Sequence, residues 1–209
     1  MILIGLTGGI GAGKSTVSAM LAQRGAVIID GDAIVRELQL SGSPVLTKIV
    51  TRFGGEVLTA KGELDRAALA SIVFADSKAL ADLNEIVHPP LGIEIAKRVD
   101  AERDSNRVVV LDLPLLSENP RRDLVGVIVV DVESEIASDR LVMFRGMSES
   151  DVDARMSNQA SRETRKNIAD FIIDNSLDLE HLKSEVERAW KWIVTLPQSL
   201  RADGGEVSQ

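Results

Sequence analysis

One short stretch near the N-terminus has the residue types and spacing needed to bind phosphate. It reads Gly8-Gly9-Ile10-Gly11-Ala12-Gly13-Lys14-Ser15, which satisfies the pattern G-x-x-x-x-G-K-[ST]. Glycines let main-chain amides turn inward around an anion, and a helix that starts behind such a loop points its positive end at the same place. In such a site Lys14 bridges the β- and γ-phosphates, Ser15 binds Mg²⁺ through its hydroxyl, and Thr16 lies near the α-phosphate.

The residues on either side of this loop support the same interpretation. Residues 2–6 are apolar or glycine, as in a strand buried on both faces. After the loop, Val17, Met20 and Leu21 recur at helical spacing up to Arg24, and Gly25 is placed to end the helix. The alternative is a glycine turn that binds nothing. The order strand, loop, helix favours a loop that binds a nucleoside triphosphate.

Acidic residues follow two further apolar runs. Residues 26–29 end at Asp30-Gly31-Asp32, and residues 108–111 end at Asp112. Ligands of parallel sheets gather at the carboxyl ends of the strands, so Asp30 or Asp32 could take the proton of an acceptor hydroxyl. The equally favoured alternative is that Asp32 caps a helix over residues 33–40. Asp112 could hold Mg²⁺ through water, or simply end a strand in a turn.

Three other features allow both a functional and a structural interpretation. Arginines in the stretch 134–166 could neutralise a phosphoryl group in transfer, although most arginines on helices are solvated surface. His88 precedes two prolines that predict a break or a kink in a helix, and a structural bend is slightly favoured over a substrate contact. The segment 114–116 could line an apolar slot or fill the core. The arginines concerned are Arg140, Arg145, Arg155, Arg162 and Arg165.

Strands alternate with helices along most of the chain, which predicts a doubly wound α/β fold with a parallel sheet. The predicted strands are 2–6, 26–29, 108–112, 125–131 and 171–173, and the predicted helices are 14–24, 133–145, 148–168 and 178–195. Residues 33–104 are mainly helical, with an interruption at 53–62. We therefore expect a core of residues 1–35 and 105–200, a helical insertion over 36–104, and a loose tail over 201–209.

Composition excludes several classes of function. The net charge is −8, which argues against a nucleic acid or an anionic membrane as the main partner. There is no cysteine, which removes disulfides, thiolate nucleophiles and cysteine-bound zinc. No apolar run approaches the roughly 18 residues of a membrane span, and the N-terminus does not read as a signal peptide. We expect a cytoplasmic monomer or weak homo-oligomer.

Residues 1 to about 195 resemble the dephospho-coenzyme A kinases. The resemblance begins with Ile4-Gly5-Leu6-Thr7 and the loop that follows. Further matches occur in order: Asp30-Gly31-Asp32 with Arg36, Gly62 with Leu64-Asp65-Arg66, Val73-Phe74, Leu83-Asn84 with His88-Pro89, Leu111-Asp112 with Pro114-Leu115-Leu116 and Glu118, Ala154-Arg155 with Gln159, and Ala169-Asp170 with Asn175. Three positions depart from the family pattern: Gly31 replaces alanine, Ser117 replaces an aromatic residue, and Arg145 follows Arg140 by five residues instead of four.

The resemblance implies transfer of the γ-phosphoryl group of ATP, with Mg²⁺, to the ribose 3′-hydroxyl of dephospho-coenzyme A. It implies a P-loop fold in three layers, in which the insertion binds the acceptor and residues 134–160 form a helical lid. The implied catalytic residues are Asp32 as general base, with Lys14 and Arg140 on the phosphoryl group. ATP would contact Gly9, Gly11, Ala12, Gly13, Lys14, Ser15, Thr16, Arg155 and Asn175. The acceptor would contact Asp32, Arg66, His88, Pro114, Leu115 and Leu116, and the metal would contact Ser15 and, through water, Asp112.

Two rival functions remain at the level of sequence. Another small-molecule or nucleoside monophosphate kinase would share the loop and differ on the acceptor side. A nucleotide switch that binds without transferring is the second rival, but the chain has no N-K-x-D motif for guanine.

Overall fold

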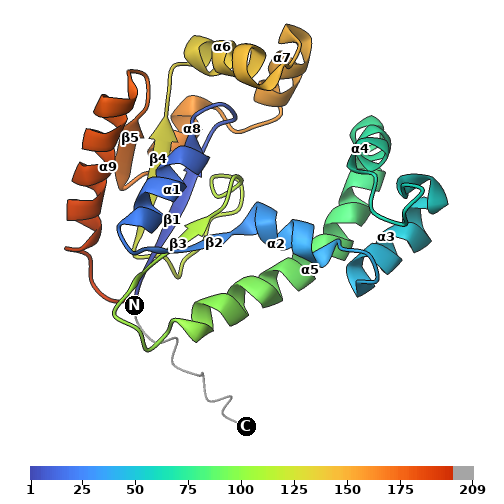
Figure 1. Cartoon of the computed structure of the whole chain (residues 1–209), viewed down its shortest axis with the longest axis horizontal. Helices are drawn as coiled ribbons and strands as arrows, with labels where there is room; N and C mark the ends of the chain where they lie inside the picture. Colours follow the sequence, from blue (N-terminus) through green and yellow to red (C-terminus); the bar gives the residue numbers. More distant parts are fainter. Residues whose placement is uncertain (200–209) are drawn as a thin grey trace. The chain divides into compact units, whose positions relative to one another are not determined.

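The computed structural model describes residues 1–199 and confirms the five-stranded parallel sheet. Its strands are β1 (Ile2–Gly8), β2 (Val27–Asp30), β3 (Val108–Asp112), β4 (Gly126–Asp131) and β5 (Phe171–Asp174). They lie in the order β2-β3-β1-β4-β5, and β1 pairs in parallel with both β3 and β4 (Figure 1). β1 is therefore the central strand, and the phosphate-binding motif begins where it ends.

The chain divides into two compact units. One unit, called the sheet unit here, consists of residues 1–29 and the residues from 102 onward. The other, the helical unit, consists of residues 30–101. The tail predicted over 201–209 lies outside the described residues.

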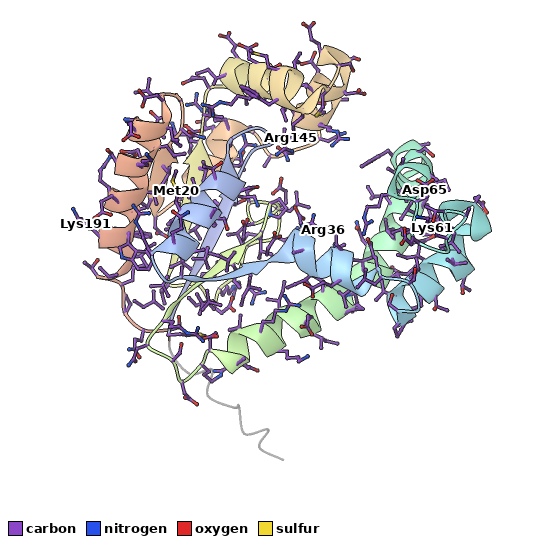
Figure 2. The ribbon with its side chains drawn as sticks, in the orientation of Figure 1. Met20, Arg36, Lys61, Asp65, Arg145 and Lys191 are labelled. Carbon is purple, nitrogen blue, oxygen red and sulfur yellow. The ribbon has the colours of Figure 1, made fainter. Side chains whose placement is uncertain are left out.

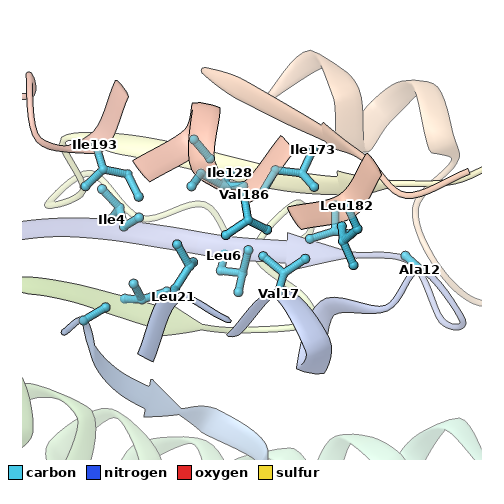
Figure 3. Close-up of a cluster of buried hydrophobic side chains, with 14 of the residues drawn as sticks. Ile4, Leu6, Ala12, Val17, Leu21, Ile128, Ile173, Leu182, Val186 and Ile193 are labelled. Carbon is cyan, nitrogen blue, oxygen red and sulfur yellow. The ribbon is translucent and has the colours of Figure 1, made fainter. Parts of the chain in front are cut away.

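The sheet unit has an aliphatic core between the sheet and two helices. Helices α1 (Lys14–Gln23) and α9 (Leu179–Ile193) point side chains at the same face of the sheet (Figure 3). The buried core residues shown there include Ile4, Leu6, Val17, Leu21, Ile128, Ile173, Leu182, Val186 and Ile193. Because α1 is anchored by this core, the loop in front of it has fixed ends.

The prediction of one helix over 148–168 was wrong. The sheet unit contains α6 (Ser134–Arg145), α7 (Glu149–Ser157) and α8 (Arg162–Asn167), with a turn over 158–161. Serine side chains cap both later helices: the Ser148 hydroxyl accepts a hydrogen bond from the Asp151 amide at 3.1 Å, and the Ser161 hydroxyl accepts one from the Thr164 amide at 3.0 Å. The second cap starts a new helix and ends the continuous pattern.

The helical unit has its own core. It comprises α2 (Gly31–Leu38), α3 (Pro44–Phe53), the 3₁₀ helix η1 (Gly55–Val57), α4 (Arg66–Ala75) and α5 (Ser77–Ala101). The predicted interruption over 53–62 contains η1 and, after it, a turn that an antiparallel bridge between Leu58 and Leu64 encloses. The buried core residues of this unit are Val45, Leu46, Ile49, Phe53, Val57, Leu64, Leu69, Val73, Ala79 and Val87.

The sequence predicts a break or a kink at His88-Pro89-Pro90, and the break does not occur. α5 is helical from Ser77 to Ala101 and contains both prolines. Each proline removes one helix hydrogen bond, but apolar residues on both sides of the pair, Val87 and Ile95 among them, are buried and keep both halves packed. Within residues 1–199, no helix has the length and apolarity needed to cross a bilayer.

Candidate active site

The loop after β1 has the backbone of a phosphate-binding turn. Gly11 and Gly13 have φ values of 78° and 86°, which side chains other than glycine rarely adopt. α1 begins directly after Gly13, which offers no side-chain cap, and the first turn of α1 has no acidic residue. The amides at the start of α1 therefore keep their capacity to bind an anion, and the helix dipole adds positive potential at the same point.

Asn175 fixes the loop from the other end of the chain. Its side-chain amide, 7% exposed, donates a hydrogen bond to the carbonyl of Ala12 at 2.8 Å. The parallel pairing of β4 and β5 brings it there, because the Asn175 amide continues the ladder with a 2.9 Å bond to the Asp131 carbonyl. A Cβ atom on Gly13 would lie 2.3 Å from the Asn175 nitrogen, so this contact leaves room only for glycine.

Lys14 forms an ion pair with Asp112 at the end of β3. The register of the sheet positions the acid, since Asp112 pairs with Leu6 two residues before β1 ends. Asp112 is 3% exposed, and the Lys14 side chain is 16% exposed. The lysine of the loop is thus held by a buried carboxylate.

The turn between α7 and α8 lies against the same loop. The side-chain oxygen of Gln159 accepts a hydrogen bond from the Ile10 amide at 2.9 Å. The guanidinium of Arg165 covers Gly9, where an added Cβ atom would lie 2.7 Å from Nη2. A cavity of about 240 Å³ opens here, lined by Gly9, Ile10 and Ala12 of the loop and by Gln159, Arg162 and Arg165.

The two arginines at this cavity have different electrostatic surroundings. Arg162 donates to both carboxylate oxygens of Asp131 at 2.8 Å and to Glu133 at 2.6 Å, and these bonds raise the pKa of Arg162. Burial lowers the pKa of Arg165, although the charges of Asp131 and Glu118 act in the opposite direction. Arg162 is therefore neutralised by protein carboxylates, and Arg165 retains a positive charge that is only partly solvated.

Glu118 supports the turn that carries these residues. Its carboxylate accepts hydrogen bonds from the Ala160 amide at 3.0 Å and from the Ser117 hydroxyl at 2.6 Å. Burial by itself would raise the pKa of Glu118, but its hydrogen bonds, together with the charge of Arg165, outweigh burial and lower the pKa. Glu118 is ionised at neutral pH and links the segment after β3 to the segment before α8.

The other predicted residues of the sheet unit lie on exposed or half-exposed positions. Ser15 and Thr16 are exposed in the first turn of α1. Arg140 is half-exposed on α6, and Arg155 is exposed on α7. Arg145 is exposed at the C-terminal end of α6 (Figure 2).

The three residues 114–116 after β3 have different surroundings. The Pro114 carbonyl accepts a hydrogen bond from the buried Thr7 hydroxyl at 3.1 Å. Leu116 is 2% exposed and packs over Gly5, where an added Cβ atom would lie 2.5 Å from it. Leu115 is 47% exposed, so it is the member of the segment whose side chain is open to a ligand.

In the helical unit, Asp30 and not Asp32 is the cap of the helix after β2, and the helix starts at Gly31 and not at residue 33. The Asp30 carboxylate accepts the Ala33 amide at 3.0 Å and lies 3.8 Å from Arg36. Asp32 lies in the first turn of α2 with an exposed side chain. The structure thus corrects the alternative that made Asp32 the cap. Arg66 and His88 are exposed on α4 and α5.

Comparison with known proteins identifies the family. The family model for dephospho-CoA kinase matches residues 2–181, which is most of the chain. The chain belongs to the dephospho-CoA kinase family.

Relatives in that family match over nearly their full length. A dephospho-CoA kinase of Streptomyces avermitilis is 49% identical over 197 residues, covering 93% of this chain and 95% of the relative. One of Thermobifida fusca is 50% identical over 192 residues, covering 91% and 96%. Among solved structures, a Thermus thermophilus protein has a TM-score of 0.78 at 32% identity, covering 93% of this chain and 96% of the other. The dephospho-CoA kinase of Campylobacter jejuni has a TM-score of 0.69 at 25% identity, covering 92% and 97%.

Sequence reasoning on this dephospho-CoA kinase family member did not assign roles to several residues at the loop. Asp131 received no role, although it ends β4 as Asp112 ends β3, and that position was an available signal. In the sequence Gln159 stands out only as a family match, and Arg162 and Arg165 only as two of several arginines. The positions of these three residues depend on the turn at 158–161, which the pattern does not reveal.

Proposed function

We propose that this chain transfers the γ-phosphoryl group of ATP to the ribose 3′-hydroxyl of dephospho-coenzyme A, giving coenzyme A and ADP. This is the final step of coenzyme A synthesis. The observation that carries the proposal is the glycine loop that leads into a helix without an N-terminal side-chain cap, with Lys14 held at the loop by buried Asp112. Family membership supplies the acceptor, since the loop alone would suit many kinases.

In the proposed reaction the 3′-hydroxyl oxygen bonds to the γ-phosphorus while the bond from that phosphorus to the β,γ-bridging oxygen breaks. Asp32 takes the hydroxyl proton, and the electron pair of the broken bond leaves with ADP. Lys14 and Arg140 stabilise the charge on the phosphoryl oxygens. Asp32 is suited to the role because its carboxylate is exposed and Asp30 has already satisfied the helix cap.

The donor atoms at the loop fit Mg²⁺. Ser15 offers an exposed hydroxyl and Asp112 a carboxylate, and hard cations prefer such oxygen ligands. Ser15 would bind the ion directly and Asp112 through water. The bound ion would neutralise charge on the β- and γ-phosphates.

We assign ATP to the loop residues Gly9, Gly11, Ala12 and Gly13, with Thr16, Arg155 and Asn175 as further contacts. The contact between Asn175 and Ala12 gives Asn175 a second role, which is to hold the loop in shape for the phosphates. The acceptor is assigned to the helical unit through Arg66 and His88, and to the segment from Pro114 to Leu116. Within that segment Leu115 is the exposed side chain.

Further proposals concern larger features. Residues 134–160 act as a lid that closes over ATP and excludes water, which would otherwise consume ATP by hydrolysis. A cytoplasmic location and a monomeric or weakly homo-oligomeric state remain predictions from the sequence.

The acceptor is tested by comparing ADP release with dephospho-coenzyme A, AMP and pantetheine under saturating Mg-ATP. We expect turnover with dephospho-coenzyme A to exceed the other two by at least ~10²-fold, because AMP lacks the pantetheine arm and pantetheine lacks the ribose hydroxyl that receives the phosphate. Mass spectrometry of the product should locate the new phosphate on the ribose 3′-oxygen. Faster turnover with AMP would assign the chain to the nucleoside monophosphate kinases instead.

A further inference from the structure

The two arginines of α8, Arg162 and Arg165, have different charge environments. Within residues 1–199, no carboxylate lies at ion-pair distance from the Arg165 guanidinium, whereas Arg162 is bound by Asp131 and Glu133. The hydrogen bond of Arg165 in that part of the chain goes to the Ala160 carbonyl. One neutral acceptor leaves most of the five N–H donors of a guanidinium available.

The unused N–H donors of Arg165 lie next to the loop. The guanidinium covers Gly9, with Nη2, Cζ and Nε at 2.7, 3.0 and 3.4 Å from the Cβ atom that Gly9 lacks. Arg165 also lines the cavity of about 240 Å³ whose wall includes Gly9, Ile10 and Ala12. The group is half-buried, and burial lowers its pKa. A cation held in this way gains most from an anion that enters the cavity.

We infer that Arg165, and not Arg162, donates hydrogen bonds to the terminal phosphates of the nucleotide bound in the loop. A guanidinium binds phosphate oxygens with two parallel bonds, and that of Arg165 lies beside the second glycine of the loop. Arg162 is already occupied by two carboxylates. The inference rests on the proposed function only in that the loop binds a nucleotide.

The rival explanation is that Arg165 only braces the turn at 158–161 through Ala160. The two roles differ in what they do to the chain without nucleotide. A brace that fails distorts the loop, so it lowers the stability of the nucleotide-free chain as well as its affinity for phosphates. A phosphate contact that fails weakens ATP and ADP and leaves both adenosine affinity and that stability unchanged, and urea unfolding without nucleotide measures the difference.

The test uses Arg165→Gln in the full chain, with Lys166→Gln as the matched control. Lys166 is the next residue on α8, is exposed, and loses the same charge. Calorimetric titration without acceptor should show that Arg165→Gln binds ATP and ADP roughly tenfold more weakly, or weaker still. A tenfold loss of affinity corresponds to about 1.4 kcal/mol of binding free energy. Adenosine affinity should stay within about twofold in both variants by the same scale. Equal losses for ATP and adenosine, or no loss for ATP, would overturn the inference.

A second variant covers the case in which Arg165→Gln does not fold. Gly9 has no positive φ, so its backbone accepts alanine, and the added methyl would push the guanidinium aside. Gly9→Ala should weaken ATP while sparing adenosine, and combining it with Arg165→Gln should add little further loss. Full additivity of the two changes in ATP binding would contradict the contact.

Turnover gives an independent readout. In Arg165→Gly, guanidinium ions added to the assay should restore part of the lost kcat, and the same ions should not stimulate Lys166→Gln. The nucleotide titrations need no acceptor, so they separate two failures. Wild-type chain that binds ATP but leaves dephospho-coenzyme A unmodified refutes the proposed function alone, and Arg165→Gln that binds ATP like wild type refutes this inference alone.

Discussion

The side chain of Asn175 holds the carbonyl of Ala12 at 2.8 Å, across 163 residues of sequence. This bond ties the phosphate-binding loop to the end of β5. The loop is thus held by β1 before it, by α1 after it, and by the side chains of Asn175 and Gln159. Nucleotide affinity should therefore depend on a residue that also serves the shape of the loop.

We predict that Asn175→Ala lowers both stability and ATP affinity. Losing a buried hydrogen bond costs roughly 1 kcal/mol, and the loop carbonyl also loses its donor. ATP affinity should fall several-fold, roughly as one such bond would give. Urea unfolding and calorimetric titration measure the two effects. Asn167→Ala, at an exposed position on α8, is the control and should change neither. Wild-type ATP affinity in Asn175→Ala would show that the loop keeps its shape without this bond.

The ion pair of Lys14 and Asp112 predicts that stability and activity can be separated. Lys14→Met removes the cation beside a buried carboxylate, so it should lower the free energy of unfolding by roughly 1–3 kcal/mol as well as abolish turnover. Adding Asp112→Asn removes the buried charge and should recover most of the stability. Turnover should stay lost in the double variant because the loop lysine is still missing.

Chemical denaturation and ADP release of the wild type, both single variants and the double variant complete this cycle. Stability losses that simply add would mean that the two side chains do not stabilise each other. Turnover restored in the double variant would remove Lys14 from the reaction.

The sequence was sufficient for the centre of the sheet because β1, β3 and β4 are buried on both faces and read as continuous apolar runs. β3 and β4 were located to within a residue at each end. The loop was equally clear, since Gly11 and Gly13 occupy positions where the backbone requires glycine. Local rules were enough where one short segment decides the conformation.

Contacts between distant segments could not be read in this way. The bond from Gln159 to Ile10 and the position of Arg165 over Gly9 depend on where α7 ends, and Ser161 decides this locally by capping a new helix. The unbroken α5 depends on packing that outweighs the cost of two prolines. The predicted N-cap of α2, Asp32, lies two residues after the observed one, Asp30, because aspartate suits a helix start at either position.

The lowered pKa of Glu118 predicts how stability changes with pH. The unfolded carboxyl titrates near pH 4.3, and the folded one titrates lower. Glu118 therefore stabilises the folded state fully above about pH 5, and this contribution is lost as the pH falls through the folded pKa. The wild type should be more stable than Glu118→Gln at pH 6, and the difference should shrink between about pH 5 and pH 3.

Denaturation at several pH values measures that difference. Glu163→Gln, at an exposed position on α8, provides the comparison and should follow the wild type at every pH. A gap between wild type and Glu118→Gln that stays constant from pH 6 to pH 3 would remove the carboxylate charge as its cause. The hydrogen bond from the Ala160 amide would then stabilise the fold independently of the charge on Glu118.

Two neighbouring carboxylates of α2 offer a matched pair for the general base. Asp30→Ala removes the helix cap, so it should lower the free energy of unfolding by about 1 kcal/mol. Asp32→Asn keeps the cap and should leave stability and ATP binding close to wild type. It should reduce turnover by at least ~10²-fold, the low end of general-base contributions, because the amide cannot accept the hydroxyl proton.

The measurement compares kcat, ATP affinity and denaturation midpoint in the two variants. The pattern expected for Asp32→Asn is a loss in kcat alone. Asp30→Ala should instead show its main loss in the denaturation midpoint, since its carboxylate is engaged with the Ala33 amide and lies near Arg36. Asp32→Asn could turn over at the wild-type rate while Asp30→Ala, fully folded under the assay conditions, is inactive. In that case the base is Asp30, and Asp32 has no part in the proton transfer.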